Sequence, residues 1–286
     1  MENKGISAGL RARVAMEKNG FRTTHSLGQN FILDDGFLNH LLNLADLKAG
    51  DRVLEIGPGP GVMTALLANR AERVLAIELD ERLQPVLGEV LEGYTNVEVI
   101  MTDALKADLG ALAQEKLDGN YRVIANLPYY ITADLVQKML QTRPLPESIC
   151  VMVQREAAER LMSHEGTKNW CALAATVQYF GECEILDEVP AELFNPPPHV
   201  DSCFIRISIQ RERMLPEGEE EAFLKLIRCC FAMRRKTLAN NLKAFYGMNQ
   251  AEAAAVILQA GFPAQVRGEA LGIDDMVALF ESLKQC

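Results

Sequence analysis

Hydrophobic and polar positions alternate over the first 210 residues in a pattern that predicts strands and helices in turn. Short runs rich in Val, Ile and Leu end at polar residues, and amphipathic segments of helical length separate them. This alternation is typical of a doubly wound, Rossmann-like α/β fold with a mostly parallel sheet. Strands are expected at 52–56, 73–78, 97–101, 121–125 and about 149–153.

The pattern changes after residue 170. One helix is expected over 170–180, and strands follow near 183–188 and 202–209. Because no segment of helical length separates these two strands, we expect the last strand to be antiparallel. At the other end of the chain, residues 7–18 predict a basic helix that Ser7 caps, with Leu10, Val14 and Ala15 on one face.

The charged stretch RERMLPEG at 211–218 predicts a domain boundary, since every segment beyond it has a helical pattern. Asn249 and Glu252 have the spacing of a capping box, and Asp274 is expected to begin the last helix. We therefore expect an α/β domain over 1–210 and a small all-helical domain over 211–286, with helices at 219–246, 250–260 and 274–284.

Three glycines on alternate positions follow the first strand in the sequence VLEIGPGPGVMT, residues 53–64. Glycine at such a turn allows close approach of backbone and ligand. The spacing excludes the dinucleotide fingerprint, since Val62 replaces its last glycine, and the P-loop, since no Gly-Lys-Ser/Thr follows. A nucleoside ligand without a pyrophosphate remains, and S-adenosylmethionine is the commonest such cofactor. We assign cofactor binding to the acid and the glycines of this stretch: Glu55, Gly57, Gly59 and Gly61.

Gly57 follows the first expected strand and polar residues stand at the ends of the next three, where the ligand of an open parallel sheet binds. Glu78, which closes the second strand, is placed to accept hydrogen bonds from a ribose diol. Asp103, after the third strand, can accept from the exocyclic amine of adenine. Either acid alone indicates only a helix cap or a surface charge, but the series with Gly57 and Asn126 favours a cofactor site.

The tetrad Asn126-Leu127-Pro128-Tyr129 follows the fourth strand and fits methyl transfer to an amino nitrogen on a planar base. Delocalisation into the ring makes that nitrogen a poor nucleophile. If the Asn126 side-chain oxygen and the Leu127 carbonyl accept its N–H bonds, the nitrogen can pyramidalise as charge develops. Pro128 directs the carbonyl, and Tyr129 offers a face on which an extruded base can stack. We expect these four residues to carry the reaction.

Composition limits the class of protein. The chain has 286 residues and a net charge of −10, so nucleic-acid contact must come from local basic patches. Seven cysteines without a C-x-x-C motif suit free thiols, and we expect no metal site. No apolar run reaches the roughly 18 residues of a membrane span, and no secretory signal is visible, so a cytoplasmic protein is expected. The residues expected to contact RNA are Arg11, Arg13, Arg228, Arg234, Arg235, Lys236 and Lys243.

Several specific segments occur in order along nearly the whole chain: SLGQNF at 26–31, VLEIGPGPGVMT, Glu78, Asp103, NLPYYIT at 126–132, VMVQREAAERL at 151–161, F-x-P-x-P-x-V-x-S at 194–202 and FAMRRKTL at 231–238. Together they resemble the small-subunit ribosomal RNA adenine N6-dimethyltransferases of the KsgA/RsmA type. The resemblance implies that S-adenosylmethionine contacts Asn30, Ile32, Gly57, Glu78, Asp103 and Asn126. It also implies a pocket for the target adenine formed by Asn126, Leu127, Tyr129 and Phe194.

The family likeness implies a substrate and a partner as well. The expected product is a pair of adjacent dimethyladenosines in the 3′-terminal hairpin loop of 16S rRNA. A member of this family acts late in small-subunit biogenesis, on a pre-30S particle, and we expect a monomer. Phe194 stands in a stiff proline-rich loop, which favours a functional role over that of a core aromatic.

Two departures from the family pattern bear on RNA contact. Thr23-Thr24-His25 stands where many relatives are rich in lysine, and Tyr130 stands where many carry asparagine or histidine. Two other functions also fit the motifs: a large-subunit rRNA adenine methyltransferase that confers antibiotic resistance, and a ribosome-assembly checkpoint protein that acts mainly by binding. A DNA adenine methyltransferase fits less well, since the C-terminal helices resemble no sequence-reading module.

Overall fold

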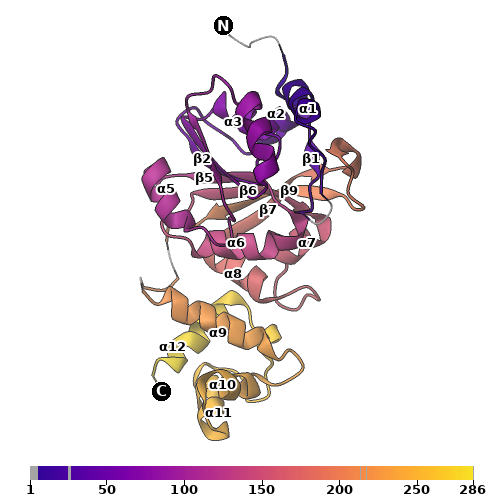
Figure 1. Cartoon of the computed structure of the whole chain (residues 1–286). Helices are drawn as coiled ribbons and strands as arrows, with labels where there is room; N and C mark the ends of the chain where they lie inside the picture. The colour runs from indigo at the N-terminus through magenta and orange to yellow at the C-terminus, as the bar shows by residue number, and fades with distance from the viewer. Residues whose placement is uncertain (1–5, 25–26, 213, 217, 286) are drawn as a thin grey trace. The chain divides into compact units, whose positions relative to one another are not determined.

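The chain forms two compact units (Figure 1), in a computed structural model that describes residues 6–24, 27–212, 214–216 and 218–285. Unit 1 holds the chain up to Ala158 together with Cys183–Ile209, and unit 2 holds Glu159–Glu182 and the chain from Gln210 onward. Segment 159–182, which we expected in the first domain, thus belongs to unit 2. Its Trp170 explains the difference, because its indole Nε1 donates to the Leu271 carbonyl at 3.1 Å within that unit.

A seven-stranded sheet forms the centre of unit 1, in the order β4-β3-β2-β5-β6-β9-β7. Strands β2 to β6 pair in parallel, and β9 runs antiparallel to β6, so the expected fold class is confirmed. The order reverses between β2 and β5, which in open α/β sheets is where ligands bind. The strands are β2 (Arg52–Ile56), β3 (Arg73–Glu78), β4 (Val97–Met101), β5 (Arg122–Asn126), β6 (Ser148–Gln154), β7 (Gly181–Val189) and β9 (Ser202–Ile209).

Helices cover both faces of this sheet (Figure 1). Buried apolar side chains of α1 to α4 form one cluster with Val53, Val74 and Ile124 of the strands. Helices α5 and α6 lie on the other side, with their apolar residues buried. The helices are α1 (Ala8–Lys18), α2 (Asp35–Leu44), α3 (Val62–Ala68), α4 (Gln84–Val90), α5 (Leu109–Leu117), α6 (Thr132–Gln141) and α7 (Arg155–Leu161), with 3-10 helices η2 (Glu81–Leu83), η3 (Tyr129–Ile131) and η4 (Ala191–Leu193).

Helix α1 packs on unit 1 mainly through its alanines. The Ser7 hydroxyl caps it by accepting from the Leu10 backbone N–H, as predicted. However, Leu10 and Val14 are half exposed, whereas Ala8, Ala12 and Ala15 are buried. Alanine side chains are small enough for the helix to approach α3 and α4 closely, so packing selects the alanine face over the larger residues.

A second, two-stranded sheet joins distant segments of unit 1. Strand β1 (Phe31–Ile32) pairs antiparallel with β8 (Phe194–Asn195), in the register Phe31↔Asn195 and Ile32↔Phe194. The sequence pattern does not predict these strands, because two residues are too few to show a period. The pairing brings the SLGQNF motif against the proline-rich loop.

Among the described residues of unit 2, the regular secondary structure is helical apart from the two residues of β7 that it contains. The capping box of Asn249 and Glu252 at the start of α11 is confirmed. The last helix begins at Ile273 behind Gly272, and Asp274 lies in its first turn, not at its cap. The helices are α8 (Ala172–Phe180), α9 (Glu220–Ala232), α10 (Leu238–Tyr246), α11 (Gln250–Gln259) and α12 (Ile273–Leu283), with a 3-10 helix η5 (Gly268–Ala270).

The single helix expected over 219–246 is wrong. The chain leaves the helix after Ala232 and resumes it at Leu238, whose backbone N–H donates to the Val266 carbonyl at 2.7 Å. The buried Asn241 amide then donates to the Cys230 carbonyl at 3.1 Å and so satisfies the end of α9. Tertiary hydrogen bonds therefore override a local helical pattern. None of the helices among the described residues has both the length and the apolar character needed to cross a membrane.

Gly110 of α5 provides a stability test of the packing in unit 1. A Cβ atom there would stand 2.1 Å from the Arg143 carbonyl oxygen, a backbone atom that cannot move alone. We expect Gly110→Ala to cost about 1–3 kcal/mol of unfolding free energy, as overpacking does. The matched control is Gly88→Ala in α4, where a Cβ would meet nothing within 4 Å; it should gain about 0.5–1 kcal/mol. Thermal melts of both variants give the signs, and equal shifts would contradict the close contact.

Candidate cofactor and base site

A cavity of about 720 Å³, including its open mouth, lies at the carboxyl ends of β2 to β5. Leu27 to Phe31 form one wall. They belong to the strap, which we define as residues 21–31; its residues 25 and 26, and so Ser26 of the SLGQNF motif, lie outside the described residues. The remaining walls come from the glycine turn, the ends of β3 and β4, and segment 126–131. The predicted residues that line this cavity are Asn30, Gly57, Gly59, Glu78, Asp103, Asn126, Leu127, Pro128 and Tyr129.

The three glycines of the turn have different structural roles. All have a left-handed backbone, with φ of 71°, 58° and 84° at Gly57, Gly59 and Gly61. A Cβ at Gly59 would stand 2.6 Å from the Phe31 ring, so only glycine lets the strap lie this close. A Cβ at Gly61 would instead meet Leu87 at 3.0 Å, which makes Gly61 a packing position away from the cavity lining.

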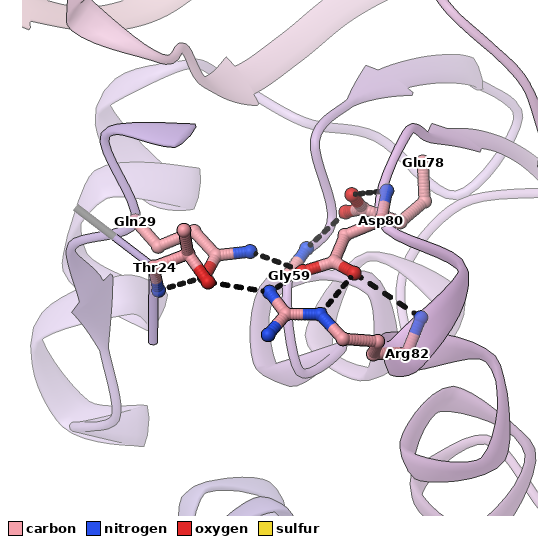
Figure 2. Close-up of polar contacts among 6 residues, drawn as sticks. All are labelled: Thr24, Gln29, Gly59, Glu78, Asp80 and Arg82. Carbon is pink, nitrogen blue, oxygen red and sulfur yellow. Dashed lines mark hydrogen bonds and ion pairs between the residues drawn. The ribbon is translucent and has the colours of Figure 1, made fainter. Parts of the chain in front are cut away.

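The Glu78 carboxylate ties the glycine turn to the end of β3 (Figure 2). Its Oε2 accepts from the Gly59 N–H at 3.0 Å and its Oε1 accepts from the Asp80 N–H at 2.8 Å. Burial raises the pKa of Glu78, and these backbone donors partly oppose that rise. Each carboxylate oxygen has a further lone pair, so the group can still accept from a ligand hydroxyl.

Glu55 lies elsewhere. It is buried, at 1% exposure, and lines a smaller cavity of about 320 Å³ that shares Phe31, Gly57 and Asn126 with the main one. Its Oε2 has no hydrogen-bond partner among the described residues. Loss of hydration raises the pKa of Glu55 to about 8. Ile32, another predicted cofactor contact, also borders this smaller cavity.

Asp103 lies at the rim beyond β4. Its Oδ1 accepts from the Leu105 N–H at 2.9 Å, and its Oδ2 lies 3.3 Å from Lys106 Nζ. The carboxylate thus caps a turn, as the simpler interpretation of an acid at a strand end predicts. It also borders the main cavity, where its oxygens have lone pairs left for a ligand amine.

Asn126 is held in one orientation. Its Nδ2 donates to the Asn30 carbonyl at 3.0 Å, and because a carbonyl only accepts, the other side-chain atom must be the oxygen. Oδ1 is therefore the acceptor that Asn126 has left in the cavity it lines. Leu127 is buried and its N–H donates to the Met152 carbonyl at 3.3 Å, which fixes the backbone beside Asn126.

Tyr129 is anchored at both ends of its side chain. Its hydroxyl lies 2.8 Å from Ser202 Oγ, and burial raises the pKa of the phenol, which stays neutral. The Phe194 ring meets it edge-on, with centroids 6.4 Å apart and planes at 73°. Phe194 is buried at 3% exposure and is absent from the described lining of the cavity, so it supports Tyr129 from behind.

A latch that the sequence analysis missed closes the strap onto β3 (Figure 2). Gln29 Nε2 donates to Asp80 Oδ2 at 2.7 Å, and Gln29 Oε1 accepts from the Thr24 N–H at 2.7 Å. Arg82 pairs with Asp80 at 2.6 Å and also donates to Thr24 Oγ1. This guanidinium lowers the pKa of Asp80. We name Gln29, Asp80 and Arg82 the strap latch. In the sequence, the only signal for it is the pair of amide side chains in the SLGQNF motif.

Some of the predicted RNA contacts already interact with other side chains of the protein, and others are exposed cations. Arg11 donates to the Tyr94 hydroxyl at 3.2 Å and lies over its ring, whereas Arg13 is exposed. In unit 2, Arg234 pairs with Glu269 and Lys243 donates to Gln250. No ion pair is recorded among the described residues for the exposed side chains of Arg228, Arg235 and Lys236.

The break between α9 and α10 places the basic residues Arg234, Arg235 and Lys236 in a loop. In this loop, all three are exposed. Cys229 and Cys230 are buried free thiols, as expected. Among residues 6–285, the described ones include no group of three or more His, Cys, Asp or Glu side chains placed to hold a metal ion.

The buried Glu55 predicts a pH dependence of stability. In the folded state the Glu55 carboxyl keeps its proton up to about pH 8, whereas in the unfolded state it releases the proton near its ordinary pKa of 4.5. Between these values the unfolded state binds fewer protons, so the unfolding free energy falls as pH rises. Between pH 5 and pH 9, the unfolding free energy of Glu55→Gln should rise by more than about 1.4 kcal/mol relative to that of the unmutated protein. Denaturation at both pH values tests this, with exposed Glu92→Gln as control; parallel pH profiles for Glu55→Gln and native chain would contradict it.

Comparisons with known proteins agree over the whole length of the chain. The sequence profile of the family described as ribosomal RNA adenine dimethylase matches residues 20–285. Ribosomal RNA small subunit methyltransferase A of Staphylococcus aureus (strain MRSA252) is 39% identical over 290 residues, covering 100% of this chain and 98% of that protein. The same protein of strain JH9 is 38% identical with the same coverage.

Solved structures give the same family. A dimethyladenosine transferase from Plasmodium falciparum superposes with a TM-score of 0.73 at 27% identity, covering 88% of this chain and 96% of that one. The 23S rRNA methyltransferase ErmE superposes with a TM-score of 0.66 at 27% identity, covering 90% and 100%. The resemblance found in the sequence motifs is confirmed, and the chain is an enzyme of the ribosomal RNA adenine dimethylase family.

Proposed function

We propose that the chain dimethylates the N6 amino groups of two adjacent adenosines in the 3′-terminal hairpin loop of 16S rRNA, with S-adenosylmethionine as methyl donor. The observation that carries the proposal is the fixed Asn126 amide, whose Oδ1 is the acceptor left beside the glycine turn. When bound, S-adenosylmethionine supplies an electrophilic methyl group on a positively charged sulfur. The rest of the reaction depends on positioning by the protein.

The cavity residues fit this cofactor. Glu78 has lone pairs left for a ribose diol, and Asp103 has lone pairs left for the exocyclic amine of adenine. The described lining of the cavity includes no Lys, Arg or His side chain, which suits a nucleoside without phosphates. Asn30 holds Asn126 through its backbone and so links the cofactor wall to the base pocket.

The base pocket has the acceptors that an amino nitrogen needs. Asn126 Oδ1 and the Leu127 carbonyl would accept the two N–H bonds of the target amine and draw its lone pair out of the ring. Such preorganised groups stabilise charge where it develops in the transition state. Tyr129 offers a ring held by Ser202 and Phe194 against which the base can stack. No general base is required, because the proton leaves after the methyl group has arrived.

Similarity favours the small subunit as the site of action. The relative named for the small subunit is 39% identical over its near-entire length, whereas the 23S rRNA enzyme ErmE is 27% identical. A cytoplasmic, monomeric enzyme that acts late on a pre-30S particle is part of the proposal. The exposed cations of Arg13, Arg228, Arg235 and Lys236 are its proposed RNA contacts, since a chain of net charge −10 needs local basic groups.

Asn126→Ala tests the mechanism. Removing one preorganised hydrogen-bonding group costs about 10²–10³-fold in kcat, and we expect a loss of that size with RNA affinity changed less than about twofold. Single-turnover methyl transfer to a hairpin RNA and filter binding measure the two effects. Asn69→Ala, an exposed helix-end residue outside the cavity, is the matched control. Native-like transfer by a folded Asn126→Ala protein would overturn the mechanism.

The strap latch predicts an effect on cofactor affinity. Asp80→Ala removes the acceptor of both Gln29 and Arg82 and so frees the wall that Leu27 to Phe31 form. Because hydrogen bonds to a charged group contribute about 1.5–3 kcal/mol, we expect the Kd for S-adenosylmethionine to rise at least about tenfold. Calorimetric titration measures it, with Asp118→Ala, an exposed ion-pair partner of Arg52, as control. An unchanged Kd in the Asp80 variant would show that the strap holds without its latch.

A further inference from the structure

Tyr130 differs sharply from its neighbour Tyr129. Its side chain is 54% exposed, although it belongs to the same 3-10 helix, η3, and lines the same cavity. The Tyr129 hydroxyl is held by Ser202 and its ring by Phe194. By contrast, no hydrogen bond of the Tyr130 hydroxyl is recorded among the described residues. The chain thus presents a large aromatic ring at the rim of its site.

The ring of Tyr130 lies against the strap on one side. Gly28 of the strap, with a left-handed φ of 60°, lies against one edge of it, so that a Cβ at Gly28 would stand 3.3 Å from Cδ1 and 3.6 Å from Cε1. This contact positions the ring through the strap and leaves more than half of the side chain open to solvent. A restrained, exposed ring loses little conformational freedom when a flat ligand covers it.

Extrusion of a target base creates a need for such a surface. A flipped nucleotide leaves the stack, and the faces of the nucleotides beside it lose their partner. Proteins that bind unpaired RNA cover such faces with aromatic side chains. Tyr129 is the ring in the base pocket of the proposed function, so a ring one residue along the same 3-10 helix is available for the next base.

We propose that Tyr130 stacks on the unpaired nucleotide directly next to the target adenosine. The inference rests on the proposed function and adds a second base site to it, specific for a flat, unpaired base and not for a phosphate. It makes Tyr130 a binding residue for RNA that does not contact the transferred methyl group. The strap then has two roles, since it forms a wall of the cofactor cavity and holds the ring that meets the RNA.

The test uses the full-length protein and a hairpin RNA in which 2-aminopurine replaces the base on the 5′ side or on the 3′ side of the target. Stacking on an aromatic ring quenches the fluorescence of this base. We expect quenching at one of the two positions with the native protein, its loss with Tyr130→Ala, and its recovery with Tyr130→Phe, which keeps the ring. Equal quenching by the native protein and Tyr130→Ala at both positions would overturn the proposal.

A thermodynamic cycle with an abasic RNA separates stacking from other effects. We expect Tyr130→Ala to weaken binding of the intact hairpin about tenfold, the size of one lost base–aromatic stack, when binding is measured without S-adenosylmethionine. With an abasic nucleotide at the quenched position, the variant should bind no more weakly than the native protein. An equal loss with abasic RNA, or a change confined to cofactor affinity, would overturn the inference.

Methyl transfer by the native protein, followed in the same samples, distinguishes the two proposals. If the native protein methylates the hairpin and Tyr130→Ala binds it equally well, the second base site is refuted and the proposed function stands. If the native protein transfers no methyl group either to the hairpin or to small-subunit particles that carry unmethylated 16S rRNA, the proposed function fails first. Melting temperatures of both Tyr130 variants confirm that each one is folded.

Discussion

The Glu78 carboxylate joins the three segments on which the site depends. It accepts from Gly59 in the glycine turn and from Asp80 after β3, and Asp80 in turn holds Gln29 and Arg82 (Figure 2). A buried carboxylate is stable only when donors surround it, so these backbone N–H groups determine where the turn and the strand end lie relative to each other. The strap follows, because its latch begins at Asp80. One group thus sets three walls of the cavity.

The base pocket depends on a second long-range association. Pairing of β1 with β8 brings Phe194 behind Tyr129, and Ser202 at the start of β9 reaches the Tyr129 hydroxyl. Residues separated by more than 60 positions therefore hold one aromatic ring. Asn126 is oriented in the same way, through the Asn30 carbonyl of the strap. Rigid support of this kind keeps acceptors and stacking surfaces in place before a substrate arrives, which is how positioned groups accelerate a reaction.

Charge is distributed in a way that fits a selective RNA-binding protein. The chain carries a net charge of −10, and several of its cations are already paired, such as Arg234 with Glu269 and Arg52 with Glu72. The exposed cations that remain include Arg13 and Arg22 of unit 1 and Arg228, Arg235 and Lys236 of unit 2. Because screening weakens distant charges at physiological salt, a few free cations act locally and do not attract polyanions everywhere.

The sequence by itself determined the strands of the seven-stranded sheet, the order of the motifs and the family. The signal for strands such as 52–56 and 73–78 lies within each segment, because a strand that is buried on both faces is mostly apolar along its length. The expected bounds of these two strands match the structure residue for residue. Polar residues at strand ends also meet for a local reason, since parallel strands finish at one edge. The capping box of Asn249 and Glu252 spans only four residues, so the sequence predicts it equally well.

Only the tertiary structure decided the rest. The break of the expected 219–246 helix depends on Asn241 and Val266, the buried face of α1 depends on how closely α3 and α4 approach, and the role of Gly61 depends on Leu87. The strap latch and the support of Tyr129 likewise join residues far apart in the chain. A local pattern specifies which backbone form a segment prefers, whereas hydrogen bonds and contacts between distant segments select which side chains converge, and those exist only once the chain has folded.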